Sequence, residues 1–485
     1  MRMTLLVRSP VVGALSRSAL LVGALGMAPA LFAQEASGGQ NVEQEDAASY
    51  NENYNSSLVI PDREVVRSGA LSSSLRLDDD DLADPSLRNV RKLWQISDNR
   101  RGETVMERRR PEYDPVGLPM GSFRLFPQAT VRGNYSNNIF RNKGSKSDVY
   151  TTIYGGVTAR STWSRHALIL DGSVDQTLYA TYSSEDALQY KVNAATRLDI
   201  SSDAQLNVTL GRQRDVLDRT AIDNDLPDTS LVKADRDNAT ATLNVVSGNV
   251  IARLGGSYSK RDYKDSYNDD GTVLSQQYRD VSDYGLNGRL AYELTPGRRA
   301  FVSLAYNRMD HRLATSANRN LRQWEMLAGI SSDITSLIRG QIAVGYIIAN
   351  FDDETKDTRR GLTADVQLDY LYSELTTFTL KGRRSVRNMA SVSASAAFVT
   401  EVSLGVNHEL LRNLILTGEG SYEVADYIDG TNVTKAWTAR FRANWMVDRH
   451  LRVNGGVNWR KRDMGISVRP DYSNVMADIG ISYLF

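Results

Sequence analysis

The sequence predicts an all-β protein: a transmembrane antiparallel up-and-down β-barrel of about 18 strands, with 16 as the alternative. Long segments alternate apolar and polar residues, which sets one strand face against lipid and the other against water. Their connections are alternately tight and long, as in barrels of this kind. The chain also ends on an apolar face with aromatic residues at its last and third-last positions, Phe485 and Tyr483.

Residues 1–33 have the pattern of a signal peptide. Three arginines precede the apolar run 19–33, which ends in small residues. Cleavage is expected after Ala30 or Ala33. The alternative is an uncleaved membrane anchor, and the shortness of the run and the glycine and proline within it disfavour that reading.

Residues 34–118 are polar and lack sustained periodicity, so a largely disordered periplasmic segment is expected. The segment contains an acidic run at 78–81 and a basic run at 108–110. Residues 84–96 could form a short helix with an N-terminal aspartate cap and apolar residues along one side. Such a helix could be a plug or docking element, but a marginal, frayed helix is the favoured reading.

The barrel is assigned to residues 119–485. In 451–460, for example, Leu451, Val453, Val457 and Trp459 alternate with Arg452, Asn454, Asn458 and Arg460. Such stretches are long enough to cross a bilayer at a tilt, whereas soluble sandwich strands average about 5–6 residues. The membrane reading is therefore favoured over a soluble β-sandwich.

Turn residues divide this region into strands. Strand starts are expected near Arg124, Asp148, Ala167, Tyr190, Gln205, Asn238, Val250, Ser282, Ala300, Gln323, Gly340, Gly361, Thr376, Ala396, Asn413, Lys435, Leu451 and Tyr472. Tight periplasmic turns are expected at 164–166, 201–204, 247–249, 295–298, 373–375 and 448–450, and longer external loops at 221–235, 265–276, 352–357 and 428–434. An even strand number leaves both chain ends in the periplasm.

Composition excludes several classes of protein. Lysine plus arginine equals aspartate plus glutamate at 58 each, so no overall field would attract nucleic acid. Mean hydropathy is -0.39, and beyond the N-terminus no apolar run approaches the roughly 18 residues of a membrane helix. Cysteine is absent, which excludes disulfides and thiolate metal sites.

A barrel of about 16–18 strands leaves room for an aqueous lumen. Both signs of charge occur among the side chains expected to face it, so no ion preference is predicted, and most of them could simply be solvated or paired. These lumen-facing candidates are Arg132, Arg160, Asp171, Asp175, Arg197, Asp199, Asp283, Arg289, Asp365, Asp369, Glu401, Arg440, Arg442, Arg452 and Arg460. Tyr154 and Tyr179 could join them, or belong to an aromatic girdle.

The sequence offers little for catalysis. Of the four histidines, His166 and His450 fall at expected turns and His311 and His408 near strand ends. No G-x-S-x-G or H-E-x-x-H motif and no regular calcium loop is present. No catalytic, metal-binding or cofactor-binding residue is therefore assigned, and the protein is not expected to be an enzyme.

The last strand is the expected assembly signal. Ile479, Ile481, Tyr483 and Phe485 lie on one face and resemble the C-terminal strand that the barrel-insertion machinery reads in bacterial outer-membrane proteins. That machinery, outer-membrane lipid and lipopolysaccharide are the expected partners, with no nucleic acid.

Residues 108–140 read RRRPEYDPVGLPMGSFRLFPQATVRGNYSNNIF. Together with STWSRHALILDGSVDQTLY and SDYGLNGRLAYELTPG, this segment resembles a family of outer-membrane β-barrel porins of proteobacteria, some associated with capsule or exopolysaccharide production. The resemblance implies a channel in the outer membrane of a Gram-negative cell. It also implies polysaccharide export, with periplasmic secretion components as candidate partners. The alternatives are a general diffusion porin for small hydrophilic solutes and a structural or adhesive surface barrel.

Overall fold

The computed structural model describes residues 104–108, 110–217, 219, 230–268, 271–312, 318–388, 396–428, 433–465 and 471–485. The strands are β1 Leu118–Met120, β2 Phe123–Ser136, β3 Asp148–Ser161, β4 Ala167–Tyr179, β5 Ala187–Ser201, β6 Ala204–Val216, β7 Lys233–Ser247, β8 Val250–Tyr263, β9 Ser266–Tyr267, β10 Val273–Leu274, β11 Val281–Thr295, β12 Arg298–His311, β13 Leu321–Asp333, β14 Ile338–Phe351, β15 Arg359–Ser373, β16 Thr376–Asn388, β17 Ala396–Leu411, β18 Leu414–Tyr427, β19 Val433–Met446, β20 Leu451–Asp463 and β21 Tyr472–Leu484. Two 3-10 turns, Ser183–Glu185 and Gln277–Arg279, lie between strands.

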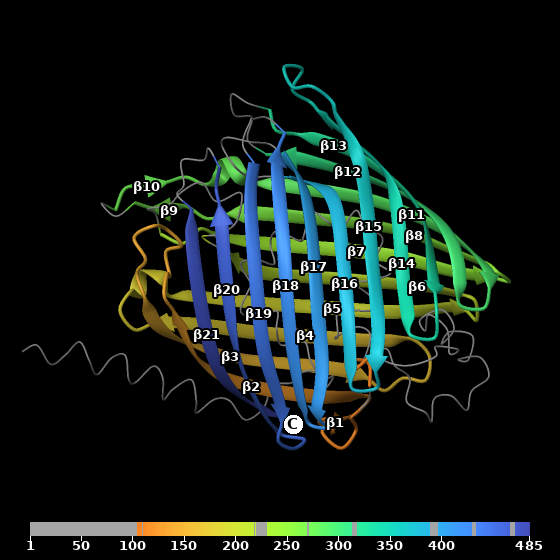
Figure 1. Ribbon diagram of the computed structural model, residues 1–485, viewed down its shortest axis with the longest axis horizontal. Coiled ribbons are helices and arrows are strands. Elements are labelled where there is room, and N and C mark those ends of the chain that lie inside the picture. Colours follow the sequence, from red (N-terminus) through yellow and green to blue (C-terminus); the bar gives the residue numbers. More distant parts are fainter. Residues whose placement is uncertain are drawn as a thin grey trace, which may run out of the picture.

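Strands β2–β8 and β11–β21 form one closed antiparallel barrel of 18 strands. Each pairs with its neighbour in sequence, and β21 closes the barrel on β2 from Gln128↔Leu484 to Ser136↔Met476. Strands of the near and far walls cross steeply in Figure 1, as the tilted strands of a barrel do. The predicted fold class and strand number are confirmed. The largest error in a strand start is at β7, which begins at Lys233 and not at Asn238.

Tight turns gather at one end of the barrel. All six predicted tight turns lie there, with two more at 334–337 and 412–413. The C-terminus and β1 are found at the same end (Figure 1). Since barrels of this kind keep short turns and both chain ends in the periplasm, the other end, with the longer connections, is extracellular.

The outer face of the barrel is apolar and exposed. Leu254, Leu286 and Val344 are each more than 60% exposed and face outward from neighbouring parts of the wall. On the extracellular side this band is bordered by aromatic pairs, Tyr258 with Tyr284 at 5.3 Å and Tyr306 with Trp324 at 4.7 Å between ring centroids. We call these four residues the outer girdle. Tyr372 and Phe378, and Tyr483 and Phe485, form pairs on the periplasmic side. An apolar band between two aromatic girdles is the surface that a bilayer requires.

The predicted signal peptide and the predicted helix at 84–96 lie outside the described residues. The same holds for most of the predicted 34–118 segment, but its last residues from Thr104 are placed against the barrel. Among the described residues, no helix is long and apolar enough to span a membrane.

Candidate functional site: the lumen and its two mouths

The inner face of the barrel is polar. In β2, for example, Gln128, Thr130, Arg132, Asn134 and Ser136 are buried inside while the intervening Val131 and Tyr135 are exposed outside. By the same strand alternation, the structure places the predicted lumen-facing residues on the inner face, namely Arg132, Arg160, Asp171, Asp175, Arg197, Asp199, Asp283, Arg289, Asp365, Asp369, Glu401, Arg440, Arg442, Arg452 and Arg460.

Inner-face arginines are concentrated on β19 and β20. The register places Arg452 opposite Met446 near the periplasmic end, Arg460 opposite Thr438 and Arg462 opposite Ala436 near the extracellular end, with Arg440 and Arg442 between them. Carboxylates of the flanking strands balance part of this charge. Arg462 donates to Glu423 of β18 at 2.7 Å and Arg442 to Asp478 of β21 at 3.4 Å. This grouping depends on strand neighbours, which residue types along one strand do not reveal.

Aromatic rings and carboxylates meet on the inner face of β3 and β4. Tyr154 lies directly opposite Asp175, and the rings of Tyr150 and Tyr179 stack with centroids 4.6 Å apart. Four residues further along β3, Thr158 donates to Asp171 at 2.8 Å. Both tyrosines left open by the sequence, Tyr154 and Tyr179, thus point to the lumen and not to a girdle.

The periplasmic mouth holds a segment that precedes the first strand, residues 104–108 and 110–117, which we call the docking segment. Val105 is completely buried and packs against Ile415 and Met446 on the inner wall. Its backbone N–H donates to Thr377 Oγ1 at 3.1 Å. The segment then turns towards β1 at Gly117, where φ is +72° and a Cβ atom would lie 2.7 Å from the Phe126 ring. Only glycine fits both constraints.

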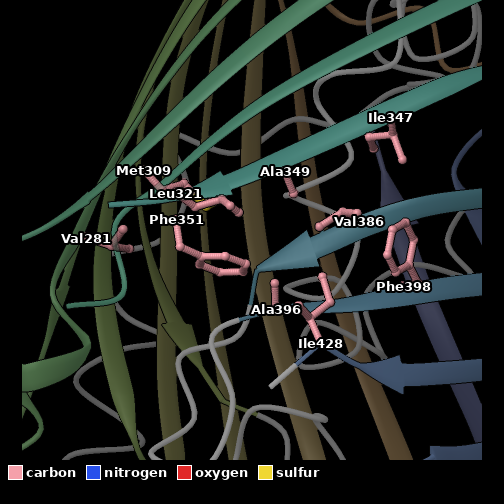
Figure 2. Packing of buried hydrophobic residues seen from close by; sticks show 10 residues of the cluster. All are labelled: Val281, Met309, Leu321, Ile347, Ala349, Phe351, Val386, Ala396, Phe398 and Ile428. Atoms are coloured by element: carbon pink, nitrogen blue, oxygen red, sulfur yellow. The ribbon is translucent and has the colours of Figure 1, made fainter. Parts of the chain in front are cut away.

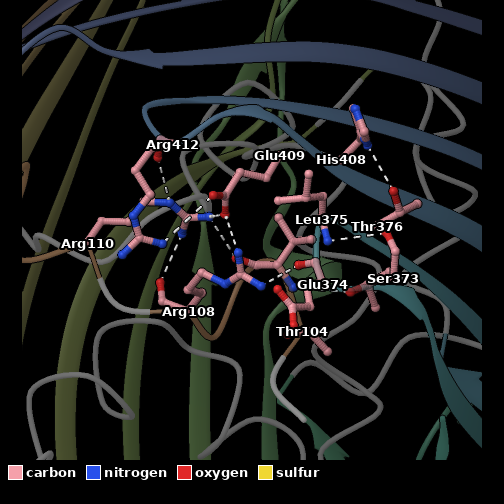
Figure 3. A network of polar contacts seen from close by, with 12 residues as sticks. Thr104, Arg108, Arg110, Ser373, Glu374, Leu375, Thr376, His408, Glu409 and Arg412 are labelled. Atoms are coloured by element: carbon pink, nitrogen blue, oxygen red, sulfur yellow. Dashed lines mark hydrogen bonds and ion pairs between the residues drawn. The ribbon is translucent and has the colours of Figure 1, made fainter.

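An ionic cluster fastens the docking segment (Figure 3). Arg110 donates to Glu409 of β17 at 2.6 Å, with the two side chains only 2% and 5% exposed. Arg108 lies 3.4 Å and Arg412 3.8 Å from the same carboxylate. Arg110 also donates to the backbone carbonyls of Val105, Arg108 and Arg412 at 2.9–3.1 Å. These hydrogen bonds compensate for burying the guanidinium.

A second, exposed contact lies at the rim of the same mouth. Arg412 donates to Glu112 at 2.9 Å. The carboxyl group of Glu112 accepts one hydrogen bond from the backbone N–H of Glu112 itself and one from Arg412. Both bonds lower the pKa of this carboxyl. Glu112 therefore stays ionised to a lower pH than an ordinary glutamate and keeps its bond to the wall.

The extracellular mouth is narrowed by an apolar cluster (Figure 2). Val386 and Phe398 share a strand face with the exposed Leu380 and Val402, yet they are 2% and 9% exposed and pack with Ile347 of the inner wall. The reason is that the β15–β16 ladder stops at Ala364↔Arg384 although both strands continue. The ends of β16 and β17 therefore lie beneath β14 and β15, inside the barrel.

The histidines take structural positions. His166 accepts the backbone N–H of Asp199 at 3.0 Å, and His450 contacts the Leu484 carbonyl at 2.8 Å. His408 contacts Thr376 at 2.9 Å, and His311 is half-buried on the inner face near the extracellular end. Within the described ranges, no group of three or more histidine and carboxylate side chains could hold a metal ion.

A closed barrel with an apolar girdled exterior and a polar interior defines an outer-membrane channel protein. The chain belongs to the family described as "Putative beta-barrel porin 2", which matches residues 110–482. The match begins at the buried Arg110 of the docking segment. Location in the outer membrane follows from this family and fold.

No curated protein matches the chain. Solved outer-membrane barrels are similar in fold alone. The siderophore receptor PirA from Pseudomonas aeruginosa aligns over 76% of this chain and 81% of its own, with 9% identity and a TM-score of 0.43. OccK2 (OpdF) from P. aeruginosa, in complex with glucuronate, aligns over 76% and 99%, with 12% identity and a TM-score of 0.44. The copper transporter OprC aligns over 76% and 82%, with 10% identity and a TM-score of 0.44.

Proposed function

We propose that this outer-membrane channel takes part in the export of capsular or extracellular polysaccharide, acting passively and without catalysis. The observation that carries the proposal is the inner wall of β3 and β4, where Tyr154 faces Asp175 and Tyr150 stacks on Tyr179. Aromatic rings offer flat surfaces for sugar rings, and carboxylates accept hydrogen bonds from sugar hydroxyls.

The two mouths support the same reading. The docking segment occupies part of the periplasmic mouth, and the apolar cluster around Phe398 narrows the extracellular one. A barrel restricted at both ends suits a channel that opens for a specific polymer. A general diffusion porin needs a permanently open lumen.

A deletion strain tests the proposal. Surface and secreted polysaccharide should fall, while uptake of small hydrophilic solutes changes little. Re-expression of the intact protein should restore export, whereas the double variant Tyr150→Ala, Tyr179→Ala should restore it only in part. Tyr284→Ala, which removes an outward-facing tyrosine of the outer girdle, is the matched control and should restore export fully.

The opposite phenotype would reject the proposal. Normal polysaccharide with slower solute uptake, together with steady open-channel conductance of the purified protein in planar bilayers, would identify a general diffusion porin. Normal polysaccharide, normal uptake and loss of surface attachment would instead favour the adhesive barrel.

A further inference from the structure

A band of charged side chains lies on the outer face of the barrel at its extracellular end. We call it the outer charged belt. It crosses β6, β7, β8, β11, β12, β13 and β14 or the residues next to their extracellular ends, and consists of Arg212, Arg214, Lys260, Lys264, Arg308, Arg312 and Arg322 with Asp235, Asp237, Asp262, Asp280, Asp310 and Asp352. The cations are exposed or half-buried, so molecules outside the barrel can reach them.

The belt lies immediately beyond the outer girdle. Along the outer face of β8, Tyr258 is followed by Lys260 and Asp262. On β12, Tyr306 is followed by Arg308, and the register sets Arg308 opposite Arg322 of β13. Girdle aromatics mark the membrane–water interface, so these charges lie at the depth of the lipid head groups.

The belt holds seven cations and six aspartates, and several of these ion pairs are shared. Three aspartates each lie between two cations: Asp235 is 2.8 Å from Arg214 and 3.0 Å from Lys264, and Asp352 is 2.8 Å from Arg322 and 3.4 Å from Arg308. Asp262 is shared in the same way by Lys260 and Arg312. Exposed ion pairs add only about 0–1 kcal/mol to stability, which does not account for this arrangement.

Within the described residues, outward-facing cations at this level are most numerous on the β6–β14 side of the barrel. On β18–β20, the outward-facing cations among the described residues are Lys435 and Lys461, and Lys461 lies over the Trp437 ring. A general need for solubility or membrane positioning would act around the whole circumference. The greater number of cations on the β6–β14 side makes that side the better place for a ligand with several anionic groups.

We propose that the outer charged belt binds the phosphate groups of lipopolysaccharide in the outer leaflet. The planar guanidinium groups of arginine match phosphate oxygens in pairs, and around Asp235 the two cations Arg214 and Lys264 share one carboxylate, which leaves positive charge for a ligand. Because the belt faces the lipid and borders the girdle, the phosphates within its reach in the outer leaflet are those of lipid head groups. This inference is independent of what passes through the lumen.

Binding of lipopolysaccharide to the purified full-length barrel in detergent tests the proposal. The probes are phosphorylated lipopolysaccharide and the same material after enzymatic removal of its phosphates, measured by native mass spectrometry. Arg308→Gln with Arg322→Gln should weaken binding of the phosphorylated form about tenfold or more, whereas Asp352→Asn, which keeps both cations, should leave it unchanged or tighter. Lys435→Gln with Lys461→Gln is the matched control on the opposite side and should bind like the wild type.

Two results would overturn the proposal: equal binding of phosphorylated and dephosphorylated lipopolysaccharide, or wild-type binding by the double arginine variant. Heat-modifiable migration on gels reports whether each variant is folded. If the double arginine variant does not fold, Lys260→Gln with Lys264→Gln removes one cation from each of two other aspartates and must show the same loss.

Discussion

Replacing Glu409 by Gln should release the docking segment from the periplasmic mouth. The Glu409 carboxylate lies within 4 Å of Arg110, Arg108 and Arg412 at 2.6, 3.4 and 3.8 Å. Removing one partner of a buried ion pair costs about 3–5 kcal/mol, because the other charge stays buried without compensation. Arg110 belongs to a segment outside the 18-strand ladder, so undocking relieves this cost without opening the barrel. The ratio of docked to undocked segment should therefore decrease by a factor of about a hundred to a few thousand.

Limited proteolysis and single-channel recording measure this change. In the Glu409→Gln protein, cleavage within residues 104–117 should be faster and conductance higher, while heat-modifiability stays normal. Glu112→Gln is the matched control, because Glu112 and Arg412 form an exposed pair that contributes about 1 kcal/mol or less. Wild-type proteolysis and conductance in Glu409→Gln would refute the reasoning that this ion pair holds the segment in place.

Three further changes test the wall of the barrel. Val457→Arg puts a charge on the lipid face near the middle of β20 and should lower the free energy of unfolding by about 2–4 kcal/mol, whereas Asn458→Arg on the lumen face should fold normally. If urea titrations find Asn458→Arg to be the less stable variant, the strand face is assigned wrongly. Phe398→Ala removes the aromatic ring from the apolar cluster at the extracellular mouth. It should lower the free energy of unfolding by about 3–5 kcal/mol and raise conductance, and an unchanged urea midpoint would contradict this packing. Tyr483→Ala with Phe485→Ala should lower outer-membrane abundance, and normal abundance in fractionated cells would show that the last strand is not the assembly signal.

Most of the barrel was predictable because strand side chains alternate in direction, a property of the local backbone. In β20, the alternation of Val453, Val457 and Trp459 with Arg452 and Arg460 was enough to separate the two faces. Turn residues then predicted about 18 strands, with 16 as the alternative. The error at β7 arose because Lys233–Asp237 reads as a polar loop, whereas the structure continues the strand beyond the apolar band into the outer charged belt. Polar strand ends resemble loops in sequence.

The sequence by itself determined the fold class, the strand number to within two and the face of most side chains, because these depend on local alternation and local turns. Only the tertiary structure decided which side chains meet. Val105 contacts Thr377, and Arg110 contacts Glu409, across hundreds of residues. Val386 and Phe398 have the sequence pattern of lipid-facing residues, yet they are buried inside because the β15–β16 ladder ends before them. Alternation assigns a residue to a face, but where a ladder ends, and so what that face touches, is set by packing between distant strands.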